Sequence, residues 1–543
     1  MRALLTTLLT ALCLLLALPV LGVLGSWLLV DEAALAVLHH QASTVLPAYA
    51  LQSALLAIGV ALGVMLLGSA TAVAVTLFDF PGRRWFEWAL LLPLAMPAYV
   101  LAYAWTDALQ YGSLLQTTLR GWLGAQGPLW PDVRSLWGAV VLFVLCLYPY
   151  VYLLARAALG ERAVQMMEAA RLLGAGPRRR VLAVALPLAR PAIAAGVALA
   201  LMEALADYGV GAYFGLTTFS TGIYKAWLVM NDRVAAAQLA SVLLLVVGGL
   251  LMAERKAQRR LRFSSSRGGQ ASSAEARPAP LHGAYAAAAW LLCALPVLLG
   301  FLLPVLWLSY MLWQEATLSE FGLPVARFLQ WALTSFKLAA MAALAATALA
   351  LVLGFALRQP GGPRAGLLRP AARVLSLGYA LPGVVIAIGI LLPLGWVQAR
   401  YPDAPLSPLV TGTLFGLLYA YMARFSAVAL QSVEAGYARV PVSVDDTARL
   451  LGSGPLRIFT ELHLPLLRRS ALAAALLVFV DVMKELPATL VLRPFGSDTL
   501  AVVAYNFARD ERLGEAALPS LAIVLVGLIP VVLLSRAMRA EPA

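Results

Sequence analysis

The sequence predicts an all-α integral membrane protein with about twelve transmembrane helices, arranged as two tandem six-helix domains. Three observations support this fold class. Hydrophobic residues make up 62% of the 543 residues and charged residues 12%, and the mean hydropathy is +0.85, which excludes an ordinary soluble protein. The apolar runs are continuous rather than alternating, which favours helices over a membrane barrel. A polar segment also occurs twice, 278 positions apart, which indicates a duplication.

Each expected span is a window of about 20 apolar residues, enough for a helix to cross a hydrocarbon core of about 30 Å. In the first half the windows lie near 4–30, 51–78, 86–106, 136–158, 188–212 and 235–253. In the second half they lie near 284–312, 334–357, 371–396, 408–432, 469–493 and 518–536. Six spans per half return both copies of the polar segment to the same side. We therefore expect a parallel repeat, with a pseudo-two-fold axis along the membrane normal.

The predicted domain bounds follow from the repeat and from one linker. The first domain covers 1–253 and contains the first polar loop, 161–190. The second covers 284–543 and contains the second polar loop, 439–468. Residues 254–283 between them are basic and rich in Ser, Gly and Ala, which is typical of a flexible connection.

The net charge of +13 raises the question of nucleic acid, but its distribution indicates a membrane instead. Basic residues cluster in alternate loops, at 83–84, 162–190, 255–277 and 358–373, whereas the first loop on the other side, 31–48, has no Lys or Arg. This positive-inside pattern places both termini and both polar loops in the cytoplasm. The apolar run after Met1 continues past residue 25 without a clear cleavage site, so we expect an uncleaved first span. The expected partner is membrane lipid, and no nucleic acid.

The sequence gives little support for a metal site or a disulfide. The three cysteines, Cys13, Cys146 and Cys293, fall inside predicted spans without close pairing and are interpreted as small core residues. His39 and His40 are adjacent, but no third ligand is evident. A metal site is therefore left unknown.

The duplicated segment has a strict internal spacing. Residues 168–190 read EAARLLGAGPRRRVLAVALPLAR and residues 446–468 read DTARLLGSGPLRIFTELHLPLLR, with twelve of 23 positions identical. An acidic residue leads each copy, a glycine follows six later, and a Leu-Pro proline follows thirteen after that. The pattern predicts a short helix, a turn and a second short helix before the next span. One copy would fit an ordinary interfacial segment, but two copies with matched spacing favour a docking element.

This spacing is similar to the EAA loop of binding-protein-dependent ABC importer permeases. The resemblance implies two fused permease domains whose polar loops form coupling helices, each seated on one subunit of a cytoplasmic ATPase dimer. The residues that it implicates in coupling are Glu168, Ala169, Arg171, Gly174, Gly176 and Pro187 in the first loop and Asp446, Arg449, Gly452, Gly454 and Pro465 in the second. The second copy departs from the family pattern, because Asp446 replaces Glu and Thr447 replaces the first Ala.

A narrower resemblance follows each loop. Residues 201–233 and 478–512 look like the fused permeases of ferric iron importers. This implies a multi-pass protein of the bacterial inner membrane, a periplasmic substrate-binding protein as partner, and ferric iron in transit. No lysine follows a glycine, so the chain has no phosphate-binding loop of its own. We therefore expect a transport subunit rather than an enzyme, without a bound cofactor, that uses ATP through the partner ATPase.

Four acidic residues lie inside or at the ends of predicted spans, where a charge costs about 2.5–3.5 kcal/mol at the helix centre. Glu203 and Asp207 are four residues apart, and Asp481 and Glu485 repeat this arrangement 278 positions later, so each pair shares one helical face. The two pairs are candidates for lining a cation pathway. Alternatively, Asp481 or Glu485 pairs with Lys484 or caps a helix broken at the following proline. The first pair has no neighbouring lysine and is the better pathway candidate.

Two other functions stay open at this point. One is an importer permease of the same family for another small solute. The other is an ion-coupled secondary transporter in which the four acidic residues act as relays. The second alternative explains the acidic residues but not the duplicated polar loops. A membrane enzyme lacks any nucleophile or metal motif to support it.

Overall fold

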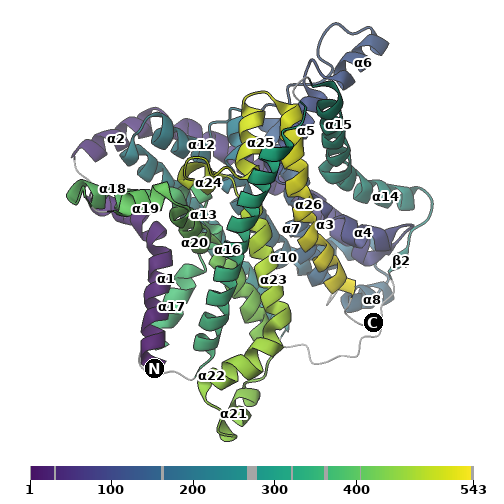
Figure 1. Cartoon of the computed structure of the whole chain (residues 1–543). Coiled ribbons are helices and arrows are strands. Elements are labelled where there is room, and N and C mark those ends of the chain that lie inside the picture. The colour runs from purple at the N-terminus through teal and green to yellow at the C-terminus, as the bar shows by residue number, and fades with distance from the viewer. Residues whose placement is uncertain are drawn as a thin grey trace. The chain divides into compact units, whose positions relative to one another are not determined.

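The computed structural model describes residues 2–29, 32–159, 164–265, 278–319, 322–359, 365–403 and 405–539. Within these ranges the regular structure is helical except for two paired strands of two residues each, β1 (Phe78–Asp79) and β2 (Ala279–Pro280). The predicted all-α class is therefore confirmed. Figure 1 shows the helices in chain order, from purple to yellow.

Up to Ser265, the helices are α1 (Arg2–Gly25), η1 (Ser26–Leu29), α2 (Glu32–Ser43), α3 (Leu46–Leu77), α4 (Arg83–Ala89), η2 (Leu92–Ala95), α5 (Ala98–Leu109), α6 (Leu114–Leu123), α7 (Leu136–Ala158), α8 (Val164–Leu172), α9 (Pro177–Arg180), η4 (Val181–Ala185), α10 (Leu186–Ala206), α11 (Gly209–Tyr213), α12 (Phe219–Tyr224), η5 (Lys225–Val229) and α13 (Arg233–Ser265). The last of these, α13, continues past the start of the predicted linker 254–283. After the linker they are α14 (Ala284–Val297), η6 (Leu298–Leu302), α15 (Leu303–Leu318), α16 (Val325–Arg358), α17 (Ala365–Leu375), η7 (Gly378–Ala380), α18 (Gly383–Arg400), α19 (Leu406–Gly412), α20 (Leu414–Tyr437), α21 (Val442–Leu450), α22 (Pro455–Arg457), η8 (Ile458–His463), α23 (Leu464–Met483), α24 (Pro487–Leu492), α25 (Leu500–Arg509) and α26 (Leu513–Arg539).

Ten helices in the described ranges are long and apolar enough to cross a membrane, or eleven if the pair bent by 90° over residues 83–123 counts as one span. The remaining expected span, near 469–493, corresponds to α23. Every 18-residue window of α23 contains Arg468, Arg469 and Asp481, so its charge rather than its length sets it apart from the others.

The helices form two compact units, and these units cut across the two halves of the sequence. Unit 1 consists of Met1–His40, Ile223–Ser241 and Pro324–Val503. Unit 2 consists of Gln41–Gly222, Val242–Leu323 and Ala504–Ala543. The first helix, α1, packs against α17 and α18 of unit 1, and the last helix, α26, packs against α15 of unit 2. The predicted bounds 1–253 and 284–543 describe the repeat in the sequence and, as folding domains, stay a prediction.

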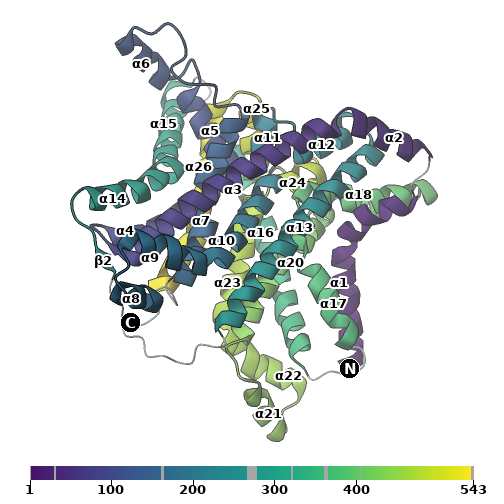
Figure 2. The same ribbon diagram turned by 180° about the vertical axis from the view of Figure 1, so that it is seen from behind.

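Unit 2 is built around three helices, α3, α7 and α10, which pack against one another and are visible together in Figure 2. Small residues allow this close packing. A Cβ atom added at Gly196 of α10 would lie 2.6 Å from the Cα of Val151 on α7, and one at Gly68 of α3 would lie 2.7 Å from the Cβ of the same valine. Close approach of helices through glycine is the usual means of association where water supplies no hydrophobic drive.

Unit 1 repeats this core with α16, α20 and α23, which also pack against one another; α16 and α23 lie side by side in Figure 1. These helices begin at 325, 414 and 464, which is 279, 278 and 278 residues after α3, α7 and α10. The duplication seen in the polar loops therefore extends to the three helices that form each core.

Candidate functional site

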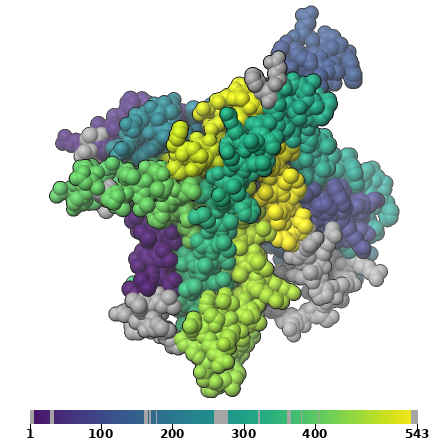
Figure 3. Space-filling model, viewed as in Figure 1, coloured from purple at the N-terminus to yellow at the C-terminus, as the bar shows by residue number. Residues whose placement is uncertain are grey.

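Both polar loops fold in the same way. In the first loop α8 is followed by a turn, the short helix α9 and the π-helix η4, which continues into core helix α10. In the second loop α21, α22 and the π-helix η8 follow the same order and continue into core helix α23. The predicted helix, turn and second short helix are thus present in both copies. In the space-filling view the second loop is the yellow-green lower tip of unit 1 (Figure 3).

The turn in each loop is a Schellman motif. In the first loop Gly174 N donates to Arg171 O at 3.0 Å, and Ala175 N donates to Ala170 O at 2.9 Å. In the second loop Gly452 N donates to Arg449 O, and Ser453 N donates to Ala448 O, both at 3.0 Å.

The two glycines are required by backbone conformation, since their φ angles are +79° at Gly174 and +81° at Gly452. An added Cβ would meet no atom within 4 Å at either position. Both glycines therefore face open space, and a side chain there would project outward from the turn.

A proline fixes the other end of each loop. Pro187 and Pro465 lie in the first turns of α10 and α23, directly after the π-helices η4 and η8. A proline ring clashes with the carbonyl four residues earlier in a regular α-helix, and a π turn widens the helix at that point. The matched prolines thus explain why the same irregularity occurs in both copies.

The remaining predicted loop residues are mostly exposed. Ala169, Arg171, Gly176, Asp446 and Gly454 all lie on the surface of their loops. The side chain of Glu168 lies outside the described part of the structure.

In the second loop Asp446, which stands where the family pattern has Glu, pairs with an arginine of its own helix. Arg449 Nη1 lies 2.9 Å from Asp446 Oδ1, and its Nη2 donates to Gln359 Oε1 at 3.1 Å. Asp446 thus pairs within α21.

Two leucine pairs in the polar loops, which the sequence pattern did not single out, are almost fully exposed in the structure. Leu172 and Leu173 are 89% and 88% exposed, and Leu450 and Leu451 are 89% and 81% exposed. Large apolar side chains exposed together on an otherwise polar loop are a mark of a protein-binding surface. The available signal was the Leu-Leu pair that both copies keep directly before the glycine.

One acidic residue of each pair lies where its core helix ends. Glu485 is 4% exposed and accepts hydrogen bonds from Ala488 N at 2.9 Å and Thr489 N at 3.0 Å, so it caps α24. Arg424 Nη1 on α20 donates to the same carboxylate at 3.0 Å. Asp207 holds the matching position in unit 2 and caps α11, accepting from Val210 N at 2.7 Å.

The other member of each acidic pair lies one turn earlier in its helix. Asp481 forms an ion pair with Lys484 at 2.9 Å. Glu203 is half-buried and forms no salt bridge with another described side chain. The capping and pairing alternatives that the sequence left open therefore describe Glu485 and Asp481. A role of any of the four residues in a cation pathway stays a prediction.

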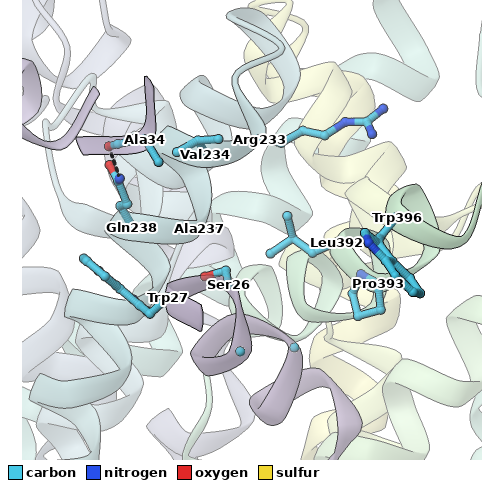
Figure 4. Close-up of a pocket in the computed structure, with 12 residues that line it drawn as sticks. Ser26, Trp27, Ala34, Arg233, Val234, Ala237, Gln238, Leu392, Pro393 and Trp396 are labelled. Carbon is cyan, nitrogen blue, oxygen red and sulfur yellow. Dashed lines mark hydrogen bonds between the residues drawn. The ribbon is translucent and has the colours of Figure 1, made fainter. Parts of the chain in front are cut away.

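A cavity of about 390 Å³ lies in unit 1, away from these acidic residues. Its wall includes Trp27 of η1, Arg233 and Gln238 of α13, and Trp396 of α18 (Figure 4). Gln238 Nε2 donates to Ala34 O at 2.8 Å, which ties α13 to α2. None of the four predicted pathway residues lines this cavity. Among the described residues, no group of three or more His, Cys, Asp or Glu could hold a metal ion.

Long apolar helices in two matching cores, each with a polar loop of the same turn geometry leading into its third helix, describe a duplicated multi-pass membrane protein. Residues 64–254 match the family described as the binding-protein-dependent transport system inner membrane component. This range contains the first polar loop and the first acidic pair. Over these residues the chain is therefore similar to the inner membrane component of such transport systems.

Similar proteins extend this comparison along the chain. The chain is 26% identical over 489 residues to the Fe(3+)-transport system permease protein FbpB 2 of Haemophilus influenzae, an alignment that covers 89% of this chain and 88% of that protein. It is 27% identical over 201 residues to the 2-aminoethylphosphonate transport system permease designated PhnU in Salmonella choleraesuis, covering 36% of this chain and 70% of that protein. The alignment with FbpB 2 spans both repeats, as expected of a fused two-domain permease.

Proposed function

We propose that the chain is the membrane subunit of an ATP-driven importer that moves ferric iron, delivered by a periplasmic binding protein, across the bacterial inner membrane. The observation that carries this proposal is the pair of polar loops with identical Schellman turns and exposed leucine pairs. A dimeric ATPase has two equal surfaces, and one chain with two equal loops can occupy both. Ferric iron is supported by the extent of the alignment with the iron permease, which covers nearly all of both chains.

The transport cycle follows from how each loop joins its core. No flexible loop separates η4 from α10 or η8 from α23, so displacement of a polar loop is transmitted to the core helix. We place both termini and both loops in the cytoplasm, as the positive-inside pattern requires. The partner ATPase binds and hydrolyses ATP, and its closure moves the two loops. The cores then alternate between inward-open and outward-open states, with populations set by the difference in nucleotide affinity of the two states.

The acidic residues have unequal parts in this proposal. Asp207 caps α11 and Glu485 caps α24, each just after the end of a core helix, and Asp481 is paired with Lys484. Glu203 is the acidic residue that we place on the cation pathway, because it has neither a capping role nor an ion pair among the described residues. A secondary transporter with all four residues as proton relays fits less well, since three of them, Asp207, Asp481 and Glu485, form capping hydrogen bonds or an ion pair.

One observation supports a second candidate substrate, a small phosphonate. The partial alignments with relatives designated 2-aminoethylphosphonate permeases cover 36% of this chain and 70% of their own length. An importer for another small solute is therefore the runner-up. Proteoliposomes that contain the chain and its cognate ATPase would separate the two, because uptake of radioactive iron from a ferric-loaded binding protein is expected and uptake of labelled phosphonate is not.

The coupling role is tested by retention of the cognate ATPase on the detergent-solubilised chain. We expect Gly174→Asp and Gly452→Asp each to reduce the retained ATPase and the double variant to abolish it, because each change strains a left-handed turn and places a charge on the docking surface. Gly496→Asp is the matched control, since Gly496 also has a positive φ of +77° and open space around it but lies outside both loops. Full retention by the double variant would refute the coupling role.

A further inference from the structure

Unit 2 contains a second cavity, of about 1090 Å³, whose walls come from four parts of the unit. These are the second half of α3, the junction of η4 with α10, the part of α13 around Leu250 and Ala253, and the segment from β2 into α14. The volume is just above the range of about 300–1,000 Å³ that is usual for pockets holding drug-sized ligands. The cavity therefore has room for a molecule much larger than a phosphate or a metal ion.

The lining of this cavity is apolar apart from three side chains. Arg190 on α10 is the charged lining residue, and Ser69 and Tyr285 are the other polar ones. Glu254, which follows the lining residue Ala253, is 6% exposed and does not line the cavity. No carboxylate of the walls therefore competes for the guanidinium of Arg190.

The depth of the cavity matches one leaflet of a bilayer. Its lining residues on α10 follow one helical face, from Arg190 through Ala194 and Val197 to Leu201. At 1.5 Å per residue, the helix from Arg190 to Leu201 covers about 16 Å, roughly half of a hydrocarbon core of about 30 Å. In the orientation proposed above, Arg190 marks the cytoplasmic end. The cavity thus extends from the cytoplasmic interface to about the middle of the membrane.

The rim of the cavity is exposed and largely apolar. Leu66 on α3 and Leu182 on η4 are 67% and 54% exposed, and Tyr285 at the start of α14 is 78% exposed. Exposed leucines on a membrane helix face lipid tails, and tyrosine is enriched at the membrane interface. Lipid therefore has direct access to this cavity, whereas a water-soluble ligand would have to pass an apolar rim.

More positive charge lies beside the arginine end. Arg178, Arg179 and Arg180 belong to α9, which directly precedes the lining residues Val181 and Leu182 of η4. Neither these three arginines nor Arg190 form a salt bridge with another described side chain. Basic pockets between membrane helices on the cytoplasmic side are typical sites for anionic lipid headgroups.

The linker of the chain has the wrong composition to fill this cavity. Residues 266–277, which follow α13, read SRGGQASSAEAR and include no large apolar side chain. Polar residues of this kind are rarely buried against apolar walls. An anionic phospholipid matches both features of the cavity, because its phosphate suits the arginines and its acyl chains suit the apolar walls.

We propose that this cavity binds an anionic phospholipid of the cytoplasmic leaflet, with the phosphate at Arg190 and the acyl chains along α3, α10 and α14. The bound lipid also contacts η4, because Val181 and Leu182 belong to the wall. It therefore supports the connection between the first polar loop and its core. The binding of lipid stands on the cavity alone, whereas its effect on transport rests on the proposed function.

Binding is tested with the delipidated, detergent-solubilised chain. Phosphatidylglycerol, phosphatidylcholine or inorganic phosphate is added, and native mass spectrometry counts the molecules retained. We expect one phosphatidylglycerol to be retained in preference to phosphatidylcholine, and phosphate alone not to be retained. Arg190→Gln should weaken the retention of phosphatidylglycerol roughly fivefold, the size of one arginine–phosphate attraction near a membrane surface.

Arg468→Gln is the matched control for charge, since Arg468 holds the same position in the second copy of the repeat and lines neither of the two cavities described. Equal retention of the two lipids by wild type would overturn the proposal. A loss in Arg468→Gln equal to the loss in Arg190→Gln would overturn it as well.

The apolar walls are tested by Ala194→Phe, which places a ring in the cavity one turn from Arg190 and should abolish the preference for phosphatidylglycerol. Gly248→Phe is the control, because Gly248 on α13 has open space around it and lies outside the lining. Unchanged retention in a folded Ala194→Phe variant would contradict the proposed site. If its thermal midpoint falls, Arg190→Gln decides the question, since the side chain of Arg190 is exposed in the free chain.

The effect on transport is measured in proteoliposomes with the cognate ATPase and a ferric-loaded binding protein. Iron uptake by wild type is expected to rise with the phosphatidylglycerol content, and Arg190→Gln to flatten this dependence. An unchanged dependence in the variant would overturn the effect of this site on transport. A wild-type chain that prefers phosphatidylglycerol but retains no ATPase would instead refute the proposed function and leave the lipid site in place, so the two failures are distinguishable.

Discussion

At the scale of single residues, polar side chains in this protein hold helix ends in place. Glu485 caps α24 and pairs with the partly buried Arg424, and Asp207 caps α11. The sequence singled out four acidic residues, Glu203, Asp207, Asp481 and Glu485, because charges in apolar spans are costly. It could not choose between pathway and capping roles, since Arg424 lies 61 residues from Glu485 and no local pattern joins them.

Glu485→Gln is expected to destabilise the protein. Glutamine can still accept one capping hydrogen bond, but Arg424 is left as a buried and unpaired charge, a loss of about 3–5 kcal/mol. The thermal midpoint of the detergent-solubilised chain measures this effect. Asp481→Asn is the matched control, because its partner Lys484 is partly exposed and such a pair contributes about 1 kcal/mol or less. Equal shifts in the two variants would contradict the capping account.

At the scale of elements, the two polar loops show what spacing can and cannot predict. The matched glycines and prolines predicted the turn and the helix start, because each has a backbone reason that the sequence alone reveals. The exposed leucine pairs were harder to recognise, since a Leu-Leu pair next to a span resembles the span itself. The buried contact between Arg358 and Asp445 was not predicted, because these residues are 87 positions apart.

The leucine pairs give a prediction for each loop separately. The double change Leu450→Ser and Leu451→Ser is expected to weaken ATPase retention by roughly tenfold or more, because burying a leucine contributes about 1.5–3 kcal/mol. The thermal midpoint should not change, since both side chains are exposed in the free chain. Retention is read by pull-down, with Leu406→Ser and Leu409→Ser on α19 as the control pair. A fall in the control that equals the fall in the loop variant would point to a general detergent effect.

At the scale of the whole molecule, the class and the duplication were predictable, but the composition of the compact units was not. Apolar composition and the repeat predicted an all-α protein with two matching cores. Nothing in the pattern indicated that α1 would pack with α17 and α18 rather than with the core of its own half. The reason is physical: α1 is apolar on nearly all sides, so no polar stripe selects one neighbour.

One contact in unit 2 joins segments 377 residues apart in the sequence and gives a pH prediction. Arg134 forms two hydrogen bonds with Glu511, at 2.7 and 2.8 Å, which lower the pKa of Glu511 from its ordinary value of 4.5. The pair therefore contributes stability at neutral pH, and this is lost as pH falls below 4.5 through the lowered pKa. Because Glu511 is largely exposed, Arg134→Gln should cost about 1 kcal/mol or less.

Thermal midpoints of wild type and Arg134→Gln, recorded from neutral to acidic pH, check this expectation. The small difference between them should close in the acidic range. A difference that grows on acidification would contradict the assigned ion pair.

The π-helices η4 and η8 have a consequence for the direction in which each polar loop faces. A π turn holds one residue more than the α-helical ladder needs, and each residue of an α-helix turns the chain by about 100°. Removing a single residue from η8 would restore a regular helix and swing α21 and its exposed leucines by about that angle around the axis of α23. The direction in which each polar loop faces is thus set by one inserted residue per copy, a length difference that no side-chain substitution can reproduce.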